Sequence, residues 1–328
     1  MNGSPVYNSF FGLHHNPFDL TPDPRCFVPT RRHNEALAAL YYGIRWHKGF
    51  VVVTGEVGTG KTLLLRCLLR LLKESKDISY SYVFNSRLSP AEFLQYFLAD
   101  FGLPTSGKNK AELLLDFGQF LVSRAADHLT TVLIIDEAHL LSEELLEEVR
   151  LLSNLETTDD KLLQIVLVGQ PELDDKLDSR GLRQLKQRIT LRAQLRSLDI
   201  HETTDYIEQR LRIAGADPNS KPIFPIESVA TIYDYSQGLP RLINTICENS
   251  LIAAYAKQSK TVGPEIIEGV AKDFRLDAGS LIAAERPALN EVDLRRVANM
   301  LLDSLTTMRE PATREARLDA VTTGREQL

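Results

Sequence analysis

Residues 55–62 read GEVGTGKT and combine closely spaced glycines with a lysine and a threonine. Between an apolar run and a helical pattern, this spacing is typical of a loop that binds phosphate groups. Glycines let the backbone turn tightly, so that its N–H groups and the following helix N-terminus face phosphate oxygens. Lys61 is expected to reach the β- and γ-phosphates, and the Thr62 hydroxyl to bind Mg²⁺. The predicted binding residues are Gly55, Glu56, Val57, Gly58, Thr59, Gly60, Lys61, Thr62 and Leu63.

An acidic pair follows the apolar run VLII, giving VLIIDE at residues 132–137. Open α/β sheets bind their ligands at the carboxyl ends of the strands, where this pair is expected to lie. Asp136 is predicted to hold Mg²⁺, directly or through water, and Glu137 to polarise the attacking water as general base. The two motifs together predict ATP and Mg²⁺ as ligands and ATP hydrolysis as the reaction.

The elements that must position these motifs alternate along the first part of the chain. Strands are expected at 50–55, 79–86, 131–137, 163–169 and 188–193, and helices at 34–48, 61–74, 90–101, 110–127 and 143–155. Continuous Val/Ile/Leu runs separated by helices indicate a parallel sheet that is covered on both faces.

After residue 196 the strand patterns stop, and helices are expected at 200–214, 226–236, 239–257 and 264–274. The predicted organisation is an extended arm at 1–30, an ATPase domain at 31–196, an all-helical lid at 197–275 and a tail at 276–328. The arm is rich in proline, glycine and aromatic residues, and its aromatics are expected to pack on the ATPase core. The tail has one candidate helix at 290–306, and its end is expected to be disordered.

Composition limits the classes of function. The 38 Lys and Arg against 44 Asp and Glu give a formal net charge of −6, so the chain as a whole is not built to coat nucleic acid. Three separated cysteines form no CxxC pair and argue against a zinc site or a disulfide framework. No uncharged apolar run reaches the roughly 18 residues that cross a bilayer, and the N-terminus lacks the features of a secretory signal. A cytoplasmic protein is expected, either free or at the inner face of the membrane through a partner.

Residues 136–139 spell DEAH, which is the name of a class of nucleic-acid helicases. Such helicases need a second, similar domain with its own motifs, and the strands required for it are missing after residue 196. The sequence therefore excludes a helicase. His139 is expected near the start of the following helix.

The order of the motifs resembles that of the AAA+ ATPases, which implies a P-loop sheet sandwiched by helices and followed by a helical lid. Asn85 would hydrogen-bond the catalytic glutamate, and Gln170 would be the sensor that contacts the γ-phosphate or its water. Arg188, with Arg183 as the second candidate, would be an arginine finger acting on a neighbouring subunit. Arg241, in GLPRLIN, would reach the phosphates from the lid. A finger acting between subunits implies a homo-oligomer, a ring or an open arc.

Longer strings resemble the general secretion pathway protein A family, also called ExeA-like ATPases, from about residue 7 to 274. They are YNSFFGLHHNPFDLTPDP, RRHNEALAALYYGIRWHKGFVVVTGEVGTGKTLLLRCLL, IIDEAHLLS, IVLVGQPEL, LRQLKQRI and GLPRLIN. The resemblance implies that Arg32 and His33 border the adenine. The best-described secretion members continue through a transmembrane helix into a peptidoglycan-binding domain, neither of which is recognisable here, so the chain resembles the ATPase-only members.

Three functions follow as alternatives. The first is an oligomeric ATPase that drives or assembles a secretion or cell-envelope export complex through a partner protein, which would be free or membrane-bound. The second is a DNA-dependent ATPase of the transposition type that recruits a transposase. The third is a signalling ATPase with slow turnover. The net charge of −6 disfavours the second, although a basic strip inside a ring would suffice to bind DNA.

Overall fold

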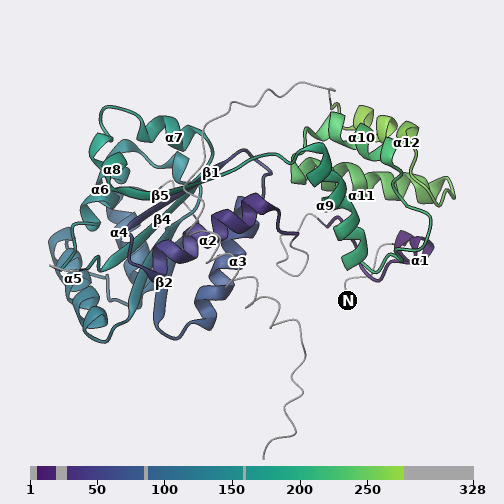
Figure 1. The fold of residues 1–328 in the computed structure, drawn as a ribbon. Coiled ribbons are helices and arrows are strands. Elements are labelled where there is room, and N and C mark those ends of the chain that lie inside the picture. Colours follow the sequence, from purple (N-terminus) through teal and green to yellow (C-terminus); the bar gives the residue numbers. More distant parts are fainter. Residues whose placement is uncertain (1–5, 20–27, 85–87, 158–159, 277–328) are drawn as a thin grey trace, which may run out of the picture. The chain divides into compact units, whose positions relative to one another are not determined.

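A computed structural model describes residues 6–19, 28–84, 88–157 and 160–276 of the chain. Its strands are β1 (Phe50–Gly55), β2 (Ile78–Val83), β3 (Thr130–Ile135), β4 (Leu163–Gly169) and β5 (Ile189–Leu195). They form one parallel sheet in the order β2-β3-β4-β1-β5 (Figure 1). Every residue of the three central strands is buried, which explains their continuous apolar runs. The predicted parallel sheet is confirmed.

Helices cover both faces of this sheet. They are α2 (Arg31–Arg45), α3 (Lys61–Glu74), α4 (Pro90–Asp100), α5 (Lys110–Ala126), α6 (Glu143–Leu152), α7 (Glu172–Leu177) and α8 (Arg183–Arg188). Phe50 and Val52 join a hydrophobic cluster with residues of α4, α5 and α6. Val51 points the other way, because side chains alternate along a strand, and contacts α2 at Gly43.

Several boundaries differ from the prediction; β2, for example, ends at Val83 and not at 86. Strand β3 ends at Ile135 and not at 137, because Glu137 has a left-handed φ of 49° that ends the extended backbone. Helix α2 begins at Arg31 because the Thr30 side chain caps it, accepting a hydrogen bond from the backbone N–H of His33. Helix α7 was not predicted, since its six residues are too few to show a helical period.

Four helices follow the sheet: α9 (Ile200–Ile213), α10 (Ile226–Ser236), α11 (Pro240–Ala256) and α12 (Pro264–Asp273). They share a second hydrophobic cluster, whose fully buried members include Ile232, Ile243 and Ile267. All four lie within two residues of their predicted bounds, because each pattern is ended by a glycine, a proline or a polar turn.

The N-terminal segment packs differently from the prediction. Its residues Tyr7, Leu13 and Phe18 belong to the cluster of helices α9–α12 and not to the core of the sheet. The Tyr7 hydroxyl donates to Glu248 of α11 at 2.6 Å. A short helix, α1 (Tyr7–Phe11), also stands within the arm that was expected to be extended. The expectation that the aromatics pack on the ATPase core was therefore wrong, because no local pattern encodes which distant helix supplies an acceptor such as Glu248.

Two predictions lie outside the described residues: Asn85 and the tail after residue 276 with its candidate helix at 290–306. Among the helices that the structure describes, none is both long and apolar enough to cross a membrane.

Gly43 and Gly118 offer a matched test of the packing of α2 on the sheet. A Cβ on Gly43 would lie 2.3 Å from Val51 Cγ2, whereas on Gly118 of α5 its nearest neighbour would be 4.0 Å away. Both changes to alanine gain helix propensity, up to about 1 kcal/mol. Gly43→Ala should nevertheless lower the free energy of unfolding by about 1–3 kcal/mol through overpacking, and Gly118→Ala should raise it. Urea unfolding measures both, and equal stabilisation by the two changes would contradict the close packing.

Candidate functional site

The predicted phosphate-binding loop connects β1 to α3, with the backbone conformation that its glycines permit. Gly58 and Gly60 have φ values of 86° and 96°, a left-handed region that is costly for other residues. Gly60 is the N-cap of α3, so the first free N–H groups of that helix open at the loop. Glu56 and Thr62 are exposed beside it. The loop thus has the strand, turn and helix that phosphate binding requires.

Lys61 lies buried at the start of α3, within reach of the loop backbone. Its Nζ donates to the carbonyl oxygens of Gly55 at 2.6 Å and Glu56 at 2.9 Å. Burial lowers the pKa of Lys61, and the nearby carboxylates of Glu137 and Asp136 oppose that shift. The ammonium group therefore lies in the electrostatic field of the acidic pair that follows β3.

Asp136 is 5% exposed and directly follows β3. Tyr82 on the neighbouring strand β2 donates its hydroxyl to Asp136 Oδ2 at 2.9 Å, and the backbone N–H of Glu137 donates to Oδ1 at 2.9 Å. Burial raises the pKa of Asp136, while the hydrogen bond from Tyr82 opposes the rise. Tyr82 was missed in the sequence, because its role depends on the pairing of β2 with β3, where it stands opposite Ile134.

Glu137 begins a short 3-10 helix, η2 (Ala138–Leu140), in a left-handed conformation. Such a conformation costs a non-glycine residue about 1–3 kcal/mol and is concentrated at functional sites. The Oε2 atom of Glu137 is buried and, among the described residues, accepts no hydrogen bond. It lies 3.4 Å from Nδ1 of His139. The carboxylate is thus held in a strained turn with acceptor capacity to spare.

Gln170, which follows β4, is brought to the same place. Its side-chain Nε2 lies 3.0 Å from Nε2 of His139, and its backbone N–H lies 3.4 Å from Nδ1 of that ring. His139 stands in η2 rather than at the start of α6, where the sequence placed it. The structure therefore gathers Lys61, Asp136, Glu137 and Gln170 at the carboxyl ends of β1, β3 and β4.

The basic segment at 180–188, directly before β5, lies at the amino ends of the strands, opposite the phosphate-binding loop. Ile189 pairs with Phe50 at the start of β1, whereas Leu195 pairs with Gly55 at the loop. The six residues of β1 span about 20 Å, at roughly 3.3 Å each. Arg188 and the exposed Arg183 are therefore remote from the phosphate-binding loop of their own chain.

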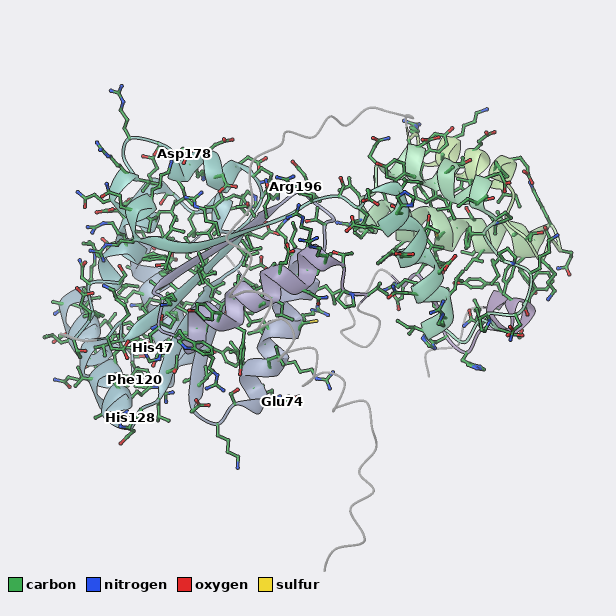
Figure 2. All side chains as sticks on the ribbon, in the orientation of Figure 1. His47, Glu74, Phe120, His128, Asp178 and Arg196 are labelled. Carbon is green, nitrogen blue, oxygen red and sulfur yellow. The ribbon has the colours of Figure 1, made fainter. Side chains whose placement is uncertain are left out.

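Within the basic segment, two side chains are held by other groups of the same chain. Arg188 donates to Ser153 Oγ at 2.5 Å. Lys186 pairs with Asp178 at 2.6 Å, and Figure 2 labels Asp178 near the end of α7. Arg183 has no such restraint among the interactions described.

Two residues outside the predicted loop contact its backbone. The backbone N–H of Arg241, in the first turn of α11, donates to the carbonyl oxygen of Gly58 at 3.2 Å. His33 of α2, 5% exposed, uses Nε2 to donate to the carbonyl oxygen of Thr59 at 2.9 Å, and its Nδ1 lies 2.7 Å from the Thr30 hydroxyl. Burial lowers the pKa of His33, which favours the neutral ring. His33 thus contacts the loop itself, and Arg32 lies near Glu35 on the surface of α2.

These features agree with what comparisons with known proteins find. Residues 44–177 match the protein family described as AAA domain. The fold is that of AAA+ proteins, with a parallel sheet and C-terminal helices, as in three solved structures. They are *Aeropyrum pernix* ORC2 with ADPNP and ADP (TM-score 0.57, 17% identity, 79% of this chain and 71% of that chain), Drosophila ORC bound to DNA (0.61, 18%, 84% and 68%) and *Thermotoga maritima* RuvB (0.52, 17%, 78% and 73%).

A curated relative gives the particular resemblance. The chain is a homologue of general secretion pathway protein A from *Aeromonas hydrophila*, at 42% identity over 258 residues, or 78% of the chain. It spans 46% of the length of that relative. The resemblance predicted from the sequence motifs is therefore confirmed, and the AAA domain implies nucleotide binding.

The buried charge of Asp136 should cost the unliganded protein stability. Its folded pKa lies above its usual value, so the folded state binds this proton more tightly and loses stability as pH rises through that pKa. Asp136→Asn should therefore raise the free energy of unfolding at pH 7.5, because the buried negative charge is removed. The difference should narrow as the pH is lowered towards 4.

Urea unfolding across this pH range measures the effect. Asp175→Asn is the control, because Asp175 is an exposed carboxylate on α7, and it should change stability by less than about 0.5 kcal/mol. A variant at Asp136 that is less stable than the wild type at pH 7.5 would contradict the assigned burial cost.

Proposed function

We propose that the chain binds ATP with Mg²⁺ and hydrolyses it. The observation that carries this proposal is a glycine-rich loop between β1 and α3, with the buried Lys61 at its end and the acidic pair Asp136 and Glu137 after the parallel strand β3. A buried lysine is suited to the β- and γ-phosphates, and the two carboxylates have the separate tasks of binding the ion and activating water. We assign the phosphate contacts to residues 55–63, with Arg241 reaching the phosphates from α11.

The residues present suit Mg²⁺ bound together with a nucleotide. Among the described residues, no group of three or more His, Cys, Asp or Glu could hold a metal alone. Mg²⁺ is usually held by one or two carboxylates with substrate phosphates and water, and Asp136 with the Thr62 hydroxyl supplies such a partial set. The ion would neutralise charge on the β- and γ-phosphates during transfer.

In the proposed reaction, a water oxygen forms a bond to the γ-phosphorus as the bond from that phosphorus to the bridging oxygen breaks. ADP leaves with the electron pair, and Glu137 accepts the proton of the water. The spare acceptor capacity of Glu137 Oε2 supports this role. Gln170 would orient the water or the γ-phosphate, and Asn85 would restrain Glu137 before a partner binds.

We infer that one protomer completes the site of the next. Arg188 and Arg183 lie at the amino ends of the strands, whereas the phosphate-binding loop of the same chain lies at the carboxyl ends. Either arginine could therefore act only on a neighbouring copy. An arginine finger supplied in this way contributes about 10³–10⁵ to the rate. Head-to-tail contacts of this kind give a ring or an open arc. Arg188 is the first candidate because it directly precedes β5.

The homology to general secretion pathway protein A supports a biological setting. We propose that the oligomer drives or assembles a secretion or cell-envelope export complex through a partner protein, on the cytoplasmic side where ATP is available. We also propose the organisation into an arm (1–30), an ATPase domain (31–196), a helical lid (197–275) and a tail (276–328).

Two substitutions test the hydrolytic assignment. Lys61→Ala should abolish detectable ATP binding. Glu137→Gln should leave the dissociation constant for ATP within about threefold of the wild type and lower kcat by 10² or more, as for loss of a general base. Nucleotide titration and steady-state phosphate release measure these values. Tight ATP binding by the Lys61 variant, or near-normal hydrolysis by the Glu137 variant, would overturn the assignment.

Mixing two inactive variants tests action between protomers. Arg188→Ala should retain ATP binding and lose at least 10³ of the rate, since its neighbour lacks the finger. Lys61→Ala cannot bind ATP but still carries Arg188. The mixture should therefore regain activity. Only pairs in which a Lys61 variant donates its Arg188 to the intact loop of an Arg188 variant should be active. Arg183→Ala, mixed in the same way, tests the second candidate, and no recovery in either mixture would exclude both fingers.

A further inference from the structure

His139 has two ring nitrogens in contact with two candidate site residues from different segments. Its Nδ1 lies 3.4 Å from Glu137 Oε2, and its Nε2 lies 3.0 Å from the side-chain nitrogen of Gln170. The His139 side chain is only 10% exposed, so water competes little for these contacts. The ring therefore lies between Glu137, near the end of β3, and Gln170, which follows β4.

Lys176 restrains the backbone of the residue that carries this ring, His139. Its Nζ donates to the carbonyl oxygen of His139 and, at 2.9 Å, to that of Leu141. Lys176 belongs to α7, which begins two residues after Gln170. The segment from Gln170 to Lys176 thus contacts both the His139 side chain and the backbone carbonyl groups of η2 and Leu141.

The ring contacts fit two tautomers. With the proton on Nδ1, the ring Nε2 accepts from the amide NH₂ of Gln170 at 3.0 Å. That N–H faces the carboxylate of Glu137. At 3.4 Å this contact is not yet a hydrogen bond, and Glu137 Oε2 has no hydrogen-bond partner among the described residues. Catalytic contacts of this kind often tighten only in the reacting complex. The other tautomer would instead let Nδ1 accept from the backbone N–H of Gln170, at 3.4 Å.

We propose that His139 is a positioning residue that couples the orientation of Glu137 to that of Gln170. It acts on the Glu137 carboxylate through Nδ1, which lies 3.4 Å from Oε2, while Nε2 contacts Gln170. When Gln170 turns towards a γ-phosphate, the ring loses its acceptor contact, and the donor to Glu137 changes with it. The inference rests on the proposed function of Glu137 and Gln170 and extends it to His139, for which the sequence analysis predicted no role.

Replacements at position 139 separate this coupling from a structural role. His139→Asn keeps an amide donor near the place of Nδ1, whereas His139→Ala keeps neither contact. His139→Ala in the full chain should lower kcat by about 10- to 100-fold, the usual cost of removing a partner that orients a functional side chain. The KM for ATP and the dissociation constant should stay within about threefold. His139→Asn should recover at least half of that loss on a logarithmic scale.

A double variant gives the decisive measurement. If His139 acts through Gln170, the double variant with His139→Ala and Gln170→Ala should have a kcat at most about threefold lower than that of the less active single variant. Multiplication of the two losses would overturn the coupling. A kcat for His139→Ala within twofold of the wild type would also overturn it. So would a loss of nucleotide affinity as large as the loss of kcat, because a merely structural role predicts that both fall together. Should the alanine variant not fold, as judged by its thermal unfolding midpoint, the cycle is measured with His139→Asn.

Glu137→Gln, assayed in parallel, separates failure of this inference from failure of the proposed function. An inactive Glu137 variant beside a fully active His139→Ala variant would overturn only the positioning role. An active Glu137 variant would remove the general base on which the positioning role depends, and would overturn both.

Discussion

The parallel alignment of β1, β3 and β4 is the constraint on which the site depends. Parallel strands end at the same edge of the sheet, so the residues that follow these three strands must meet there. The phosphate-binding loop follows β1, the acidic pair follows β3 and Gln170 follows β4. This arrangement brings the buried Lys61 into the field of Asp136 and Glu137.

This gathering of charge has an energetic cost in the protein alone. Burial opposes the charged forms of Lys61 and Asp136 alike, and their mutual attraction offsets only part of that cost. The strained backbone of Glu137 adds to it. The hydrogen bonds of Tyr82 to Asp136 and of Lys176 to the backbone of η2 restrain the groups that bear this cost.

Much of the fold could be predicted because its signals are local. The bounds of β1 and α3 follow from an apolar run, a glycine-rich loop and a helical period, and the structure has them where they were expected. The contacts of Tyr82, His33 and His139 could not be predicted in this way. Each joins segments that are 26 to 54 residues apart, and their pairing is decided by strand register and helix packing. The docking of Tyr7 on Glu248 was missed for the same reason.

Completion of the ATP site between protomers is tested most directly by the steady-state ATPase rate per protomer, measured as protein concentration is raised. If neighbouring protomers complete each site, the rate per protomer should be very low in dilute protein, rise steeply with protein concentration and reach a plateau, all without nucleic acid. A rate per protomer that is constant across the same range would contradict it. A rate that appears only with duplex DNA would contradict the self-assembling export ATPase and favour the transposition type.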